Sequence, residues 1–372
     1  MSKPEESTAG ALWVTRAGLE QLIGALKARG YQVIGPRLGE GAIIYDRIET
    51  IADLPSGWTE EQEAGTYRLR PRDDDALFGY NLGPQSWKKF LHPPVLRLFS
   101  AERKDGEFRI LPSEDKPPNY AFLGVRACEL AAIEVQDRVL MGDEFVEPNY
   151  QARRAGLFII AVQCTRAAPT CFCTSMGTGP QVRGGADVVL TELAEGFLAR
   201  PGSERGAELL AGIEHVPAAE QQCRQAEEAV AAAANQIVRH IDTRDLVRRI
   251  YEASESPHWD DVARRCLACA NCTLVCPTCF CTTVEDTSTV AGDRAERWRK
   301  WDSCFTESFS YIHGGSVRMS VRSRYRQWLT HKLASWVDQF DMFGCVGCGR
   351  CISWCPARID LTQEVNKLVA RT

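Results

Sequence analysis

The chain has 372 residues, of which 44% are hydrophobic and 25% charged, a balance typical of a globular rather than a disordered protein. Its 44 Lys and Arg against 49 Asp and Glu give a net charge of −5, which indicates neither a nucleic acid nor an anionic membrane as partner. No stretch approaches the roughly 18 consecutive apolar residues of a membrane span, and the start MSKPEESTAG lacks the apolar core of a signal peptide. We therefore expect a cytoplasmic protein.

The first half of the chain alternates predicted helices and strands. Apolar residues over 15–30 follow the helical period, and Gly30 stands where a C-terminal cap belongs. The next predicted elements are buried strands at 119–125 and 156–162, a helix at 128–140 and a third strand at 186–193. This alternation is typical of an α/β domain with a partly parallel sheet.

The second half has a different composition. Residues from about 217 to 250 are rich in Ala, Glu and Arg and predict a helical connection between domains. Beyond 250 there is little strand pattern. We therefore predict an α/β domain over 1–240 and a mainly helical domain over 241–372.

Sixteen cysteines are the outlying feature of the composition. None precedes Cys128, and eleven fall between 266 and 355. Disulfides are rare in a reducing compartment, so clustered thiols there indicate metal, most often zinc or iron–sulfur.

Two runs share the spacing C-x2-C-x2-C-x3-C-P, at 266–277 and 345–356. This is the bacterial ferredoxin run, in which three cysteines wrap one [4Fe–4S] cluster and the fourth reaches the other. Zinc sites that use two C-x2-C pairs would leave the third and fourth cysteines of each run without a role. We therefore predict a dicluster ferredoxin-like C-terminal domain with iron as its metal. The predicted ligands are Cys266, Cys269, Cys272 and Cys355 for one cluster, and Cys345, Cys348, Cys351 and Cys276 for the other.

A basic stretch lies between the two runs. It contains Arg318, Arg322, Arg324, Arg326, His331 and Lys332. The surroundings are not basic, so nucleic acid is not indicated. A solvated helix face, docking on an acidic partner and compensation of cluster charge all remain open.

Four upstream cysteines are candidates for a third cluster. Cys128 and Cys164 each follow a predicted strand, and the carboxyl ends of strands in an open α/β sheet share one crevice. Cys171 and Cys173 follow in a loop whose sequence, PTCFCT, recurs at 277–282. We predict that Cys128, Cys164, Cys171 and Cys173 form a third [4Fe–4S] site. Buried inert thiols and zinc are the alternatives.

The remaining cysteines have no assigned ligand role. Cys279, Cys281 and Cys304 either line the cluster pocket or pack as small apolar side chains, and Cys223 in its Ala-rich segment reads as structural. Neither a dinucleotide-binding nor a P-loop motif is present, and no hydrolase signature is found. The sequence therefore predicts one-electron transfer without catalytic residues of its own, in a subunit of a larger oxidoreductase.

Six segments of the sequence resemble a known family. They are GVRACELAAIEVQDRV (124–139), QCTRAAPTCFCTSMGTGP (163–180), CLACANCTLVCPTCFC (266–281), WDSCF (301–305), RYRQWLTHK (324–332) and GCVGCGRCISWCP (344–356). Together they are similar to the iron–sulfur β subunit of cytosolic NAD(P)-linked [NiFe]-hydrogenases, the sulfhydrogenases, and to the A subunit of anaerobic sulfite reductase. The similarity spans roughly 120–360, with a weaker match over 11–48.

The resemblance implies a subunit that carries electrons between a flavin subunit acting on NAD(P)H and the hydrogenase small and large subunits. FAD and the nickel–iron centre would then belong to the partners. It also supports the idea that the four upstream cysteines act together. Two alternatives stay open: the same role in a sulfite reductase, and a sulfur-reducing subunit whose third cluster has an open coordination position.

Overall fold

The computed structural model describes residues 10–104, 106–113, 116–142 and 145–370. The prediction of no signal peptide rests on the start of the chain, where residues 1–9 lie outside the described part. Among the described residues, no helix has both the length and the apolar character needed to cross a bilayer.

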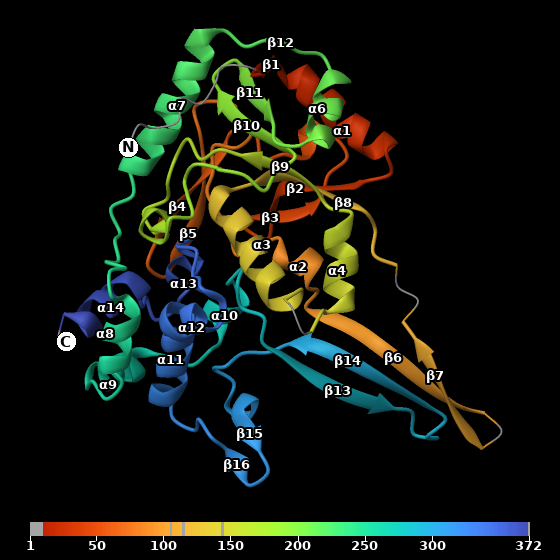
Figure 1. Ribbon diagram of the computed structural model, residues 1–372, viewed down its shortest axis with the longest axis vertical. Coiled ribbons are helices and arrows are strands. Elements are labelled where there is room, and N and C mark those ends of the chain that lie inside the picture. The colour runs from red at the N-terminus through yellow and green to blue at the C-terminus, as the bar shows by residue number, and fades with distance from the viewer. Residues whose placement is uncertain (1–9, 105, 114–115, 143–144, 371–372) are drawn as a thin grey trace.

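An eight-stranded sheet organises the N-terminal part of the chain (Figure 1). Four consecutive strands of this sheet pair in parallel, and the other neighbouring pairs are antiparallel. In sheet order the strands are β12 (Val216–Pro217), β1 (Leu12–Val14), β11 (Gly196–Pro201), β10 (Val188–Leu193), β9 (Phe158–Val162), β8 (Tyr120–Val125), β2 (Gln32–Gly39) and β3 (Ala42–Arg47). The three predicted strands are confirmed as the adjacent strands β8, β9 and β10.

Helices cover both faces of this sheet. Leu123 of β8 belongs to one apolar core together with Leu22 of α1 (Arg16–Ala28), whereas Phe122 belongs to a second core with Ile133 of α3 (Ala127–Leu140). Strands buried on both faces are apolar throughout, which is why they were recognisable as short apolar runs. The other helices of this part are α2 (Lys88–Leu91), α4 (Pro148–Ala155), α5 (Cys173–Met176), α6 (Glu204–Ala211) and α7 (Glu220–Asn235), with a 3-10 turn at Ile51–Asp53.

A second sheet, of four strands, extends away from the first (Figure 1). It pairs β6 with β14, and thus joins segments from both sides of residue 240. In sheet order its strands are β13 (Thr282–Ser288), β14 (Arg294–Trp301), β6 (Val95–Lys104) and β7 (Glu107–Pro112). Two short hairpins complete the strands: β4 (Trp58–Glu63) with β5 (Thr66–Pro71), and β15 (Tyr311–Ile312) with β16 (Gly315–Ser316).

The expectation of a mainly helical C-terminal domain is not confirmed, because β13 and β14 lie within it. Most of β13 is exposed, and four of its seven cross-strand partners are charged. Arg297 pairs with Asp286 at 2.7 Å. A strand without a buried face has no apolar alternation, so the sequence pattern missed it.

Helices surround the cysteine runs at the C-terminal end of the chain (Figure 1). Their shared core is rich in aromatic side chains, among them Trp259, Tyr325 and Trp328. The helices are α8 (Leu246–Glu252), α9 (His258–Arg265), α10 (Asn271–Leu274), α11 (Val321–Thr330), α12 (Trp336–Phe340), α13 (Arg350–Ser353) and α14 (Leu361–Val369), with a 3-10 turn at Glu307–Ser310 and the π-helical turn η3 (His331–Ser335) between α11 and α12. The short helices α10 and α13 each contain the third cysteine of a run and lie against each other.

Candidate functional site

The two ferredoxin runs adopt the same backbone conformation. In the first run Ala268 and Ala270 have positive φ, at +50° and +65°. The equivalent positions of the second run, Gly347 and Gly349, have φ of +64° and +76°. An alanine rarely adopts this conformation, so two of them at matched positions indicate a loop whose path is dictated by what it surrounds.

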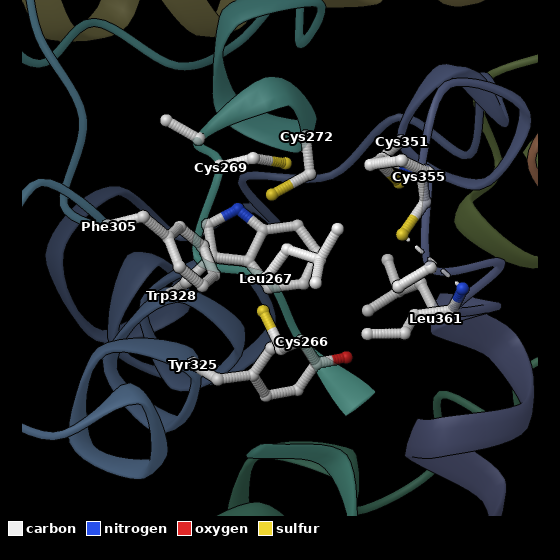
Figure 2. Close-up of a pocket in the computed structure, with 14 residues that line it drawn as sticks. Cys266, Leu267, Cys269, Cys272, Phe305, Tyr325, Trp328, Cys351, Cys355 and Leu361 are labelled. Carbon is white, nitrogen blue, oxygen red and sulfur yellow. Dashed lines mark hydrogen bonds between the residues drawn. The ribbon is translucent and has the colours of Figure 1, made fainter. Parts of the chain in front are cut away.

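Four thiols converge on one apolar cavity, which we name site 1 (Cys266, Cys269, Cys272 and Cys355) (Figure 2). Three come from the first run, and Cys355 comes from the end of the second. Aromatic side chains close the cavity, among them Phe305, Tyr325 and Trp328. Cys269 is exposed, so one side of the site reaches the protein surface.

The electrostatics of site 1 suit a cationic core. Burial raises the pKa of Cys272 well above its usual value, and the neighbouring Cys266, Cys355 and Cys269 raise it further. Thiols held together in this way cannot all ionise unless positive charge enters among them. Four thiolates around an iron–sulfur core satisfy that condition, and the residues present therefore fit such a group.

A second group, site 2, brings together Cys276, Cys345, Cys348 and Cys351. Burial raises the pKa of Cys351 well above its usual value, and Cys345, Cys348 and Cys276 raise it further. The structure thus places the last cysteine of each run with the first three of the other. Cys351 also lines the cavity of site 1, so the two sites are neighbours.

Site 3 comprises the upstream cysteines Cys128, Cys164, Cys171 and Cys173. Cys128 lies in the first turn of α3 just after β8, and Cys164 follows β9, the parallel neighbour of β8. Burial raises the pKa of Cys171 to about 12, and Cys164 is the next cause. Burial raises the pKa of Cys128, and Cys173, Cys348 of site 2 and Cys164 raise it further, so the four upstream thiols lie near one another despite their separation in sequence.

Sites 2 and 3 are joined by interlocking loops. The N–H of Phe172 donates to the carbonyl of Gly347 at 2.9 Å, and the Thr178 hydroxyl donates to the carbonyl of Val346 at 2.7 Å. A Cβ added at Gly347 would lie 2.6 Å from the Cα of Cys173. The loop of the second ferredoxin run therefore packs directly on the loop that carries Cys171 and Cys173.

A buried ion pair lies at this junction. Arg350 Nη2 donates to Glu129 Oε1 at 2.5 Å, and both side chains are almost fully buried. The indole of Trp87 donates to the other oxygen of Glu129 at 2.9 Å. Sequence reasoning missed both partners. The sequence did contain a signal for them, because Glu129 is adjacent to the candidate ligand Cys128 and Arg350 is adjacent to the candidate ligand Cys351.

The basic stretch is not a solvated face throughout. Lys332 and Arg324 are 4% and 8% exposed, and Arg324 donates to the carbonyl of Phe305 at 2.9 Å. Arg326 lies toward the surface and pairs with Glu255 at 2.9 Å. The buried members, Arg324 and Lys332, therefore make their hydrogen bonds inside the protein, and Lys332 contacts Cys276 of site 2 directly.

Cys279 lies beside Cys276 of site 2, and Cys281 and Cys304 lie beside each other. A hydrogen bond with Cys279 is the largest influence that lowers the pKa of Cys276. A hydrogen bond with Cys304 likewise lowers the pKa of Cys281, to about 7. Cys223 lies apart in α7, among Ala11, Leu198 and Ala226.

In the described ranges, no three or more His, Cys, Asp or Glu are placed to hold a single metal ion.

Comparison with known proteins adds two findings. A family model described as a 4Fe-4S dicluster domain matches residues 265–359, which include both runs. The sulfhydrogenase 2 subunit beta of Pyrococcus furiosus is 33% identical over 283 residues, which are 74% of this chain and 82% of that protein. No solved structure matches the chain. The C-terminal part is thus a dicluster domain for at least two [4Fe–4S] clusters.

Proposed function

We propose that this chain, which belongs to the family of sulfhydrogenase β subunits, relays electrons between a flavin subunit that reacts with NAD(P)H and the small and large subunits of a [NiFe]-hydrogenase. The relative's name and the dicluster domain support an iron–sulfur subunit of a hydrogenase. In this proposal FAD and the nickel–iron centre are carried by the partner subunits, and the chain has no catalytic residue.

The cysteines divide into three ligand sets. Sites 1 and 2 would each hold one [4Fe–4S] cluster through four thiolates, and site 3 would hold a third. A bound [4Fe–4S] cluster supplies one-electron transfer at a potential set by its surroundings. The protein contributes thiolate ligands, burial and fixed charges. The cation of Arg350, between sites 2 and 3, is balanced by Glu129.

The observation that carries the proposal is the contact between Gly347 and Cys173. It supports a path between sites 3 and 2, because the loop that carries Cys173 packs against the loop of the second ferredoxin run. Sites 1 and 2 are also coupled, since beyond burial Cys276 raises the pKa of Cys272 and Cys272 raises the pKa of Cys351. Three ligand sets that lie next to one another in space favour a relay of electrons over a purely structural role.

One end of this series reaches the surface. Cys269 of site 1 is exposed, and the adjacent Leu267 is 67% exposed. An exposed leucine beside an exposed ligand suits a protein–protein contact at which an external redox group approaches site 1. We therefore place one partner subunit at this end.

Iron counting on the anaerobically purified full chain tests the proposal. Three clusters give about twelve iron and twelve acid-labile sulfide per chain, and two give about eight of each. We expect about twelve in the native chain, about eight in Cys128→Ala and an unchanged count in Cys223→Ala. A fully loaded native chain with about eight would remove site 3 from the relay.

Turnover measurements test the absence of an active site. The fully loaded chain without partners should oxidise neither hydrogen nor NAD(P)H and should not evolve sulfide from a sulfur substrate. Addition of the flavin and hydrogenase subunits should restore the coupled reaction. Turnover by the isolated chain would contradict the proposal and favour the open-site alternative.

A further inference from the structure

Lys332 is a buried cation whose ammonium group contacts the sulfur of Cys276, a proposed ligand of site 2. It lies in η3, a π-helical turn of a kind that often occurs at functional sites. Its Nζ donates to Cys276 Sγ at 3.1 Å, to Thr278 Oγ1 at 3.0 Å and to the carbonyl of Gly344 at 3.3 Å. An ammonium group has three donors, so these three contacts fix it toward site 2.

The charge of Lys332 has no carboxylate beside it. Within the described part of the chain, the ion pairs include none for Lys332, whereas the buried Arg350 is paired with Glu129. Burial of an unpaired charge is strongly unfavourable. The negative charge that stabilises this ammonium therefore comes from nearby thiolates, Cys276 first and then Cys279 and Cys345, and from the cluster that site 2 would hold.

The surroundings of site 1 are different. Its cavity is lined by apolar and aromatic side chains such as Trp328. The donors to its sulfurs are backbone groups, the N–H of Ala268 to Cys266 at 3.4 Å and the N–H of Ile359 to Cys355 at 3.3 Å. Arg324 also acts on Cys266 electrostatically, but its guanidinium donates to a carbonyl. Among the described residues, Cys276 of site 2 accepts from a side-chain cation that has no carboxylate partner, whereas Cys266 and Cys355 of site 1 accept from backbone groups.

We propose that Lys332 raises the reduction potential of the cluster at site 2 above that of the cluster at site 1, so that site 2 collects the electron within the dicluster domain. Reduction adds negative charge to an already anionic cluster. A fixed ammonium group hydrogen-bonded to a ligand sulfur stabilises the reduced form more than the oxidised form. This inference rests on the proposed cluster assignment. It adds which of the two C-terminal clusters has the higher reduction potential.

Redox titration of the full, anaerobically purified chain, followed by electron paramagnetic resonance, tests the proposal. We expect Lys332→Met to lower the reduced-to-oxidised ratio of one cluster at least tenfold at fixed potential, which is 59 mV for a one-electron couple. The signals of the other clusters should move far less. Lys332→Arg keeps the charge and should keep most of the native potential.

Lys88 offers a matched control. It is also buried, at 5% exposure, but its ammonium donates to the carbonyl of Cys279 at 3.0 Å and lies over the Trp301 ring. Lys88→Met removes a buried charge without removing a donor to a ligand sulfur. We expect a smaller shift than for Lys332→Met, and an equal shift would overturn the direct role of Lys332.

Cluster loading separates the possible failures. Lys332→Gln keeps a donor near Cys276 and serves if Lys332→Met loses iron. An unchanged potential in an iron-complete Met or Gln variant overturns the inference. Loss of the same cluster in both, with retention in Lys332→Arg, overturns it too and assigns Lys332 to assembly. A native chain with fewer than about eight iron atoms at full loading would instead refute the cluster assignment itself.

Discussion

Gly347 lies directly against Cys173, and there is no room for a side chain between them. The absent Cβ would be 2.6 Å from the Cα of Cys173, and φ at Gly347 is +64°. One residue therefore meets two demands, a left-handed backbone in the ferredoxin run and a close approach to the N-terminal loop. This contact makes the N-terminal cysteines and the dicluster domain parts of one assembly.

Substitution at this contact should separate site 3 from site 2. We expect Gly347→Ala to lose iron from site 3 and to disturb site 2, because the new Cβ must displace the backbone at Cys173. The measurement is iron per chain, with about four or more atoms lost. Gly24→Ala is the control, since its Cβ would meet nothing within 4 Å. Equal iron in both variants would show that the loops tolerate separation.

The exposed ligand of site 1 should be separable from the rest of the fold. We expect Cys269→Ala to lose about four iron atoms while the eight-stranded sheet stays folded, because its cores contain no residue of site 1. Circular dichroism and iron content together check this. Cys223→Ala, outside all three sites, should retain full iron. An unchanged iron content in Cys269→Ala would contradict the ligand assignment.

Replacing only one partner of the buried pair of Arg350 and Glu129 should strongly destabilise the fold. Glu129→Gln leaves the buried guanidinium without its counter-charge and weakens the acceptor of the Trp87 and Tyr45 hydrogen bonds. We expect a loss of about 3–5 kcal/mol in the free energy of unfolding, seen as a lower anaerobic melting temperature.

A double variant sharpens this test. Glu129→Met with Arg350→Met removes both charges, and it should be less destabilised than the sum of the two single variants. Strict additivity would mean that the two side chains do not act as a pair.

Buried His92 should make the fold sensitive to acid. Burial, together with the nearby Arg299 and Lys88, lowers its pKa from 6.5 to about 3. Between pH 6.5 and about 3, His92 is therefore protonated in the unfolded chain but neutral in the folded chain. Its contribution to the free energy of unfolding is complete above pH 6.5 and decreases as the pH falls below that value. From pH 7 to pH 5 the loss from this group is about 2 kcal/mol.

Melting temperatures measured over this pH range check the role of His92. His92→Leu should flatten the decline, and His313→Gln, at an exposed position, should leave it as in the native chain. If both variants lose stability with acid as the native protein does, the sensitivity lies in other groups.

Local chemistry in the sequence was sufficient for much of the fold. The strands β8 and β9 are apolar at almost every position because both faces of the sheet are covered, and that pattern is legible without a structure. The helix α1 was equally clear, with Thr15 accepting from the Gly18 N–H at its start. Strands β13 and β14 were not, because their stability comes from pairing with β6 and from charged cross-strand contacts.

The sequence by itself determined the two ferredoxin runs, since a fixed spacing between cysteines dictates how a short loop can wrap a cluster. Only the tertiary structure decided which other groups face those loops. For the basic stretch that contains Lys332, the sequence left a solvated face, a docking surface and compensation of cluster charge open, and packing places the Lys332 ammonium against Cys276. The contact of Gly347 with Cys173 joins residues 174 positions apart. Such neighbours depend on how whole elements pack, and no local pattern of residues records that.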